Sequence, residues 1–183
     1  MAFLIAILEE TVRFVCLAFM MKSYRKRTDA MMFGIGYGAI GMLIGGGLPA
    51  FNDLITATAI NSGAVAELDA AAQESFLVAA NSMTQLPGIS FLMTGFDQAC
   101  IAIMSVALAV LMMEGINANN KRMLVVTMTV RVMALCCPIL VSSLWKWGFF
   151  TASAFLITIA VFSIWYLVKT KKPDPMKPNF RHL

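Results

Sequence analysis

Five ionisable side chains lie inside long apolar stretches of this chain. Glu9, Glu10 and Arg13 interrupt the first stretch, whereas Asp97 and Arg131 lie in two later ones. Charge inside a membrane-spanning helix is costly, so such residues pair with one another and mark either a functional site or a packing network. Glu9 and Glu10 precede Arg13 by four and three residues, so both can share its helix face. Asp97 and Arg131 are expected at similar depths on neighbouring helices and are natural partners.

The acidic and basic residues within these stretches differ in number. Three acids face two arginines, which leaves one carboxylate without a matched cation. An unpaired carboxylate at mid-membrane depth is expected to be protonated or to hold a cation. A buried salt-bridge network that only fixes helix packing is the alternative, and both interpretations stay open.

The stretches that carry these residues predict an all-α integral membrane protein. Of 183 residues, 60% are hydrophobic and 13% charged, and the apolar runs are long enough to cross ~30 Å of hydrocarbon. We expect one transmembrane helical domain over residues 1–170, a bundle of about five spans. They are predicted at residues 3–21, 31–49, 88–113, 123–144 and 148–168.

Basic residues predict the orientation of these spans. Those after the first span, between the third and fourth, and after the fifth all fall on one side if the spans alternate, whereas Lys146 is the single basic residue of the other side. The positive-inside rule therefore predicts a cell-membrane protein with its N-terminus outside and its C-terminus in the cytoplasm. The abrupt start of the first span would also be explained if the chain lacks earlier spans.

An outer segment and a tail complete the chain. Apolar residues recur every three or four positions within residues 62–85, which predicts an amphipathic helix that lies on the outer membrane surface or covers the bundle. Residues 171–183 form a basic, proline-rich tail predicted to be cytosolic and attracted to anionic lipid.

Glycines in the second span predict close helix packing. Gly34, Gly38, Gly41 and Gly45 recur at intervals of four, three and four, so they line one helix face on which another backbone can approach. Tyr37 lies at the edge of this strip, from which its hydroxyl could reach the polar residues of the first span.

Neither metal nor nucleic acid is indicated by the residues. The four cysteines show no CxxC spacing and no nearby histidine, so they predict neither a zinc site nor a disulfide framework. The basic residues follow the membrane face and form no reading surface for nucleic acid. The expected partner is the lipid bilayer.

The first two spans resemble the YhfC-type family of bacterial intramembrane metalloproteases, which is similar to the CAAX-processing and bacteriocin-immunity membrane proteases. The resemblance rests on the sequence from Leu8 to Phe14 (LEETVRF), a basic loop, and the sequence from Phe33 to Gly41 (FGIGYGAIG). It implies a family pattern of Glu-Glu-x-x-Arg followed by Gly-x-Gly-His-Gly-Gly-x-Glu. Glu9, Glu10 and Arg13 would then be catalytic candidates, and zinc the cofactor if the family activity survives.

This chain departs from that pattern where the chemistry is expected. Tyr37 stands in place of the histidine, and Gly41 in place of the second glutamate. The single histidine, His182, lies in the tail. A catalytic zinc site ordinarily needs two or three histidines with carboxylates, so no metal site is expected here.

Three functions follow from these observations. The first is a proteolytically inactive family member that binds a membrane peptide or a membrane-protein subunit. The second is an active peptidase in which Glu9 or Glu10 activates water while Arg13 or Tyr37 stabilises the oxyanion. The third is a small transporter coupled to ions or protons, in which the surplus acid binds the cation.

Overall fold

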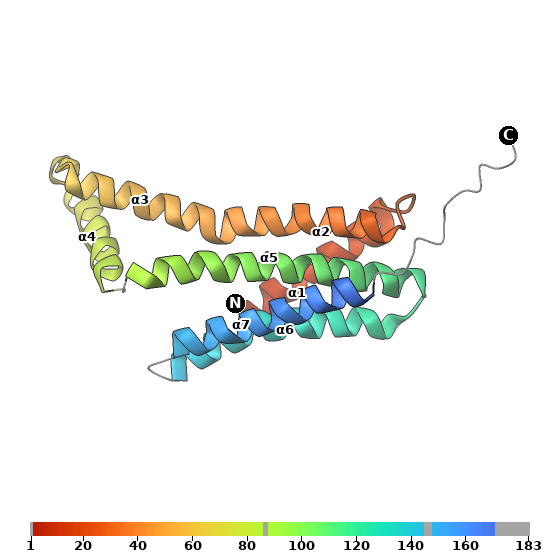
Figure 1. The fold of residues 1–183 in the computed structure, drawn as a ribbon. Helices are drawn as coiled ribbons and strands as arrows, with labels where there is room; N and C mark the ends of the chain where they lie inside the picture. Colours follow the sequence, from red (N-terminus) through yellow and green to blue (C-terminus); the bar gives the residue numbers. More distant parts are fainter. Residues whose placement is uncertain (1, 86–87, 145–147, 171–183) are drawn as a thin grey trace, which may run out of the picture. The chain divides into compact units, whose positions relative to one another are not determined.

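The structure, a computed structural model, describes residues 2–85, 88–144 and 148–170, and every regular element among them is a helix (Figure 1). Lys146 and the tail at residues 171–183, with His182, lie outside them. The main helices are α1 (Ala2–Val15), α2 (Arg27–Met42), α3 (Leu48–Asn61), α4 (Ala70–Thr84), α5 (Gly88–Asn117), α6 (Lys121–Leu144) and α7 (Gly148–Lys169). The prediction of an all-α membrane protein is confirmed.

Four helical runs among the described residues are long and apolar enough to cross a membrane. They are Arg27–Asn61, Gly88–Asn117, Lys121–Val141 and Phe150–Lys169. Helix α1, with the π-helical turn Cys16–Met20 that follows it, forms in place of the first predicted span. It is not among the four, and it carries three ionisable residues. That α1 also crosses the membrane stays a prediction.

The second predicted span is longer than residues 31–49. Helix continues through a π-helical turn at Leu43–Gly47 into α3, which ends at Asn61. Pro49, the last residue of the predicted span, lies in the first turn of α3, directly after the π-helical turn. The N–H of Leu48 bonds to the carbonyl of Leu43, in the wider pattern of the π-helical turn.

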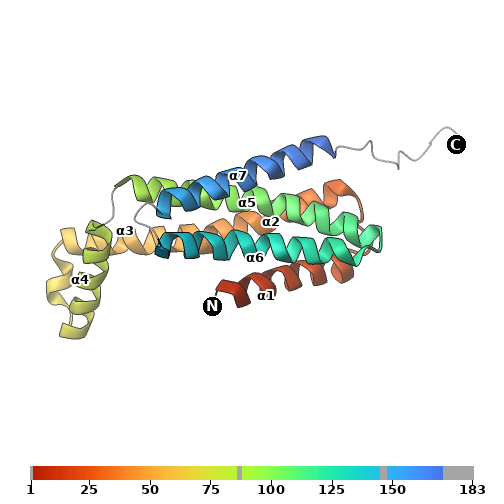
Figure 2. The same cartoon turned by 90° about the horizontal axis from the view of Figure 1, so that it is seen from below.

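The chain divides into two compact units, and the single transmembrane domain stays a prediction. The first comprises residues 1–38 and 100–183 and the second residues 39–99. In the first unit α1 packs against α6, and α6 against α7 (Figure 2). Its largest buried apolar cluster consists of Leu17, Ala30, Ala109, Val110, Met112 and Met113. Aliphatic and methionine side chains fill this core, as expected of gap-filling residues.

The second unit holds the predicted amphipathic helix. Helix α4 begins at Ala70, where the carboxylate of Asp69 accepts a hydrogen bond of 2.8 Å from the N–H of Ala72. It packs against α3 (Figure 1). The half-buried residues of α4 include Ala72, Phe76, Ala79 and Met83, which belong to the predicted apolar face.

The glycine strip has a close neighbour along only part of its length. A Cβ added at Gly34 would lie 2.6 Å from the Cα of Val106, and one at Gly38 would lie 3.1 Å from the Cα of Ala102. One at Gly41, in the second unit, would meet no atom of the described residues within 4 Å, so the close packing of this glycine stays a prediction. Periodicity gives the direction of a residue around the helix axis, but not whether another helix passes there. Gly45, in the second unit, lies instead against the side chain of Gln98.

Candidate functional site

Helix α1 turns its charged residues inward and its apolar residues outward. Glu10 and Arg13 are fully buried, on the same face as Ala6 and Leu17. The exposed residues of the helix include Leu4, Leu8 and Val12. This arrangement inverts that of a surface helix in water and suits a helix with lipid on its outer side.

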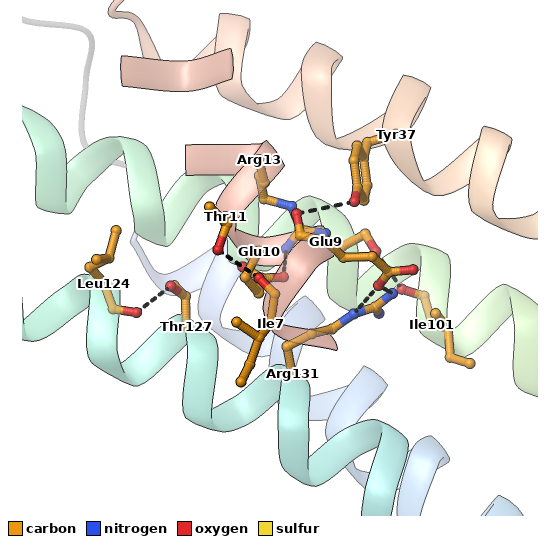
Figure 3. A network of polar contacts seen from close by, with 11 residues as sticks. Ile7, Glu9, Glu10, Thr11, Arg13, Tyr37, Ile101, Leu124, Thr127 and Arg131 are labelled. Atoms are coloured by element: carbon orange, nitrogen blue, oxygen red, sulfur yellow. Dashed lines mark hydrogen bonds and ion pairs between the residues drawn. The ribbon is translucent and has the colours of Figure 1, made fainter. Parts of the chain in front are cut away.

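Two ion pairs link these charges, one within α1 and one between helices (Figure 3). The Nη1 of Arg13 donates a hydrogen bond to Oε1 of Glu10, three residues earlier. Arg131, on α6, donates from both Nε and Nη2 to Oε2 of Glu9, with a distance of 2.9 Å from Nε. These four residues form a charged cluster. The Glu9 side chain retains 32% of its exposure, that of Arg131 only 6%, and those of Glu10 and Arg13 none, so Glu9 is the most accessible of the four.

Tyr37 joins the cluster from α2. Its hydroxyl donates a hydrogen bond of 3.2 Å to the backbone carbonyl of Glu9 (Figure 3). The guanidinium carbon of Arg13 lies 4.6 Å from the centroid of the Tyr37 ring, a cation–π distance. Phe33 stacks on the same ring, with centroids 5.9 Å apart. The closely packed Gly34 and Gly38 flank Tyr37 and hold this part of α2 in place.

Within the first unit, two acids and two arginines of the cluster form matched pairs. Glu10 pairs with Arg13, and Glu9 with Arg131, a partner that the sequence did not suggest. The pairing of Asp97 with Arg131 and the surplus acid stay predictions. The third acid, Asp97, belongs to the second unit and is half-buried on α5.

Several polar atoms of the cluster have no hydrogen-bond partner among the described residues. They are Oε2 of Glu10, Nε and Nη2 of Arg13, and Nη1 of Arg131. Guanidinium nitrogens can only donate, so the atoms without a partner are three donor nitrogens and one acceptor oxygen. Buried polar groups are almost always satisfied, so the cluster is suited to a molecule that supplies acceptor oxygens, such as water, a carbonyl or a carboxylate.

The cluster does not fit a zinc ion. The described residues contain no group of three or more His, Cys, Asp or Glu side chains that could hold a metal. Both carboxylates already bind guanidinium groups, and a divalent cation beside Arg13 and Arg131 would be repelled by two positive charges.

Sequence reasoning missed a second polar network, at the far end of α5 and α7. Tyr166 donates a hydrogen bond of 2.7 Å to Glu114, whose other oxygen lies 3.6 Å from Nη1 of Arg27. Nη2 of Arg27 also bonds to the carbonyl of Leu167, at 2.7 Å. Glu114 was the available signal, since it is an acid that directly follows the apolar run of the third predicted span.

Comparisons with known proteins agree with the motifs in α1 and α2. A sequence model of the YhfC intramembrane metalloprotease family matches residues 1–143, which include every residue of the cluster. A curated relative, the uncharacterized membrane protein YhfC of Bacillus subtilis (strain 168), is 24% identical over 172 residues. The alignment covers 91% of this chain but 65% of the relative, so the chain spans somewhat less than two thirds of that protein's length. No solved structure matches the chain.

Proposed function

Because this chain belongs to the YhfC intramembrane metalloprotease family, we propose that it is a member that binds a membrane peptide without a zinc ion. The observation that supports this proposal most is the state of the two carboxylates. Glu9 and Glu10, which the family motif would use for catalysis, are each paired with an arginine. In that state they are poor metal ligands and weak bases, whereas the unsatisfied guanidinium nitrogens favour an acceptor oxygen.

A membrane peptide offers such an acceptor in its terminal carboxylate and its carbonyl groups. A carboxylate bound between Arg13 and Arg131 would gain charge-assisted hydrogen bonds in a region shielded from water. Glu9 is the most exposed member of the two ion pairs, so its movement away from Arg131 would open the cluster to the peptide.

Peptide binding in nanodiscs tests the proposal. The probe is a fluorescent 20-residue leucine and alanine peptide, made with a free C-terminal carboxylate and, as the matched control, with a C-terminal amide. We expect the carboxylate form to bind more tightly, and Arg131→Lys to reduce that preference because lysine keeps the charge but loses the planar pair of donors. Equal affinity for both peptides would contradict recognition through the arginines.

Activity and metal content are measured in the same preparation. Cleavage of the peptide that disappears in Glu10→Gln, while the variant keeps the unfolding midpoint of the parent chain, would show a working peptidase instead of a binding protein. Stoichiometric zinc in purified protein would overturn the metal-free interpretation. Liposome flux that depends on pH and vanishes when Glu9, Glu10 and Asp97 are neutralised would establish a transporter.

We also propose that the N-terminus lies outside the cell and the C-terminus in the cytoplasm. Within the first unit, hydrogen bonds connect the basic segment before α2 to the two other basic segments. The side chain of Asn117, next to the turn that leads into α6, donates to the carbonyl of Arg25. Arg27 donates to the carbonyl of Leu167, near the end of α7. This common end supports the charge bias on which the orientation rests.

A further inference from the structure

An apolar groove lies between α5, α6 and α7, away from the charged cluster. It encloses about 420 Å³, within the range of small-molecule sites. Its walls run from Met104 to Leu111 on α5, from Met133 to Val126 on α6, and from Phe155 to Tyr166 on α7. Val126, Met133 and Phe162 are 45%, 50% and 65% exposed, so the groove opens to the outside of the first unit.

The length of the groove matches one leaflet of a bilayer. From Phe155 to Tyr166 its α7 wall rises through eleven residues, about 16 Å at ~1.5 Å per residue. The hydrocarbon core of a bilayer is ~30 Å thick, so one leaflet contributes about half of that. An acyl chain that enters at one membrane face would therefore fill the groove without crossing the midplane.

Basic residues extend two of the walls at one end. On α6, Arg122 precedes Val126 by four residues and shares its helix face. On α7, Lys169 follows Tyr166 by three residues. Glu114 lies at the same end, but Tyr166 and Arg27 contact its carboxylate. The charge left at this end of the groove is positive.

We propose that this groove binds one acyl chain of an anionic phospholipid, whose headgroup phosphate is held by Arg122 and Lys169. The apolar lining accepts the chain, and its length places the headgroup beside the two basic residues. These residues belong to the segments that the charge bias assigns to the cytoplasmic leaflet, where anionic lipids are concentrated.

Lipid retention by the purified full chain tests this site. The protein in mild detergent is supplied with phosphatidylglycerol or phosphatidylcholine of identical acyl chains, and bound lipid is counted by native mass spectrometry. We expect phosphatidylglycerol to be retained preferentially, and Arg122→Gln or Lys169→Gln to weaken its binding about fivefold each. Lys22→Gln, which removes the same charge outside the groove, is expected to leave retention unchanged.

The acyl chain is tested by filling the groove. Thr158→Phe on α7 and Val126→Phe on α6 both project into it and are expected to abolish retention, whereas Ile157→Phe, beside it on α7, is the matched control. Equal retention of both lipids would overturn the proposal. A preference for phosphatidylglycerol that persists in both Thr158→Phe and Val126→Phe would also overturn it, because the lipid would then bind by its headgroup alone. A filled groove that changes only the oligomeric state would assign the surface to a second copy of this chain.

Discussion

At the scale of single residues, the chemistry of this chain depends on which arginine pairs with each of two glutamates. Arg13 holds Glu10 within one helix, and Arg131 reaches Glu9 from another. Each carboxylate is thereby neutralised where an isolated charge would be prohibitively costly. The same pairing that makes the cluster stable removes the ligands that a metal would need.

Neutralising Glu10 tests how much the buried Glu10–Arg13 ion pair contributes to the free energy of unfolding. Glu10→Gln leaves Arg13, which is fully buried, without its counter-charge, and we expect it to lower the free energy of unfolding by about 3–5 kcal/mol. The measurement is the unfolding midpoint in a detergent titration, with Glu74→Gln on the exposed face of α4 as the control. The double variant Glu10→Gln/Arg13→Gln should recover part of the loss; losses that simply add would refute the coupling.

Replacing Tyr37 by histidine tests the absence of a metal site. Tyr37→His restores the histidine that the family resemblance implies at this position, yet we expect the purified variant to contain far less than one zinc ion per chain. The carboxylates of Glu9 and Glu10 remain paired with arginines, and one histidine is too few for a catalytic site. Elemental analysis after dialysis against zinc is the measurement, and stoichiometric zinc in this variant alone would show that a single ligand was missing.

At the scale of elements, the position of the cluster follows from the packing of α2. Gly34 and Gly38 allow the backbone of α2 to approach that of α5, and Tyr37 lies between them. Backbone approach of this kind is a common basis of helix association in membranes, where lipid removes most of the hydrophobic drive.

Two leucine substitutions distinguish the packed glycine from the open one. In Gly34→Leu the new side chain would overlap the backbone of Val106, and we expect a loss of about 1–3 kcal/mol or failure to fold. Gly41→Leu, with open space around its Cβ, should leave the unfolding midpoint nearly unchanged. Equal damage from both would mean that Gly41 also packs against a neighbour.

At the scale of the whole molecule, the proposed orientation in the membrane rests on the distribution of the basic segments. A green fluorescent protein fused after Leu183 is expected to fluoresce, and alkaline phosphatase fused at the same point to be inactive, because the C-terminus is assigned to the cytoplasm. Replacing Lys121 and Arg122 by glutamine should weaken this preference. The opposite pattern of reporter activity would reverse the orientation.

The residue types and their order were sufficient to predict the helices and the family of this protein. Long apolar runs have few stable arrangements in a bilayer other than helices, and the Glu-Glu-x-x-Arg motif of α1 led to the family that the comparisons confirm. The second span was predicted to end at Pro49, but the helix continues beyond it, after a π-helical turn at Leu43–Gly47.

Only the tertiary structure decided which charges meet. Within the first unit Arg131 pairs with Glu9, a contact that depends on the rotation and crossing of α1 and α6 and not on sequence spacing. The groove between α5, α6 and α7 was likewise invisible in the sequence, because its lining is ordinary apolar membrane sequence until three helices are placed side by side.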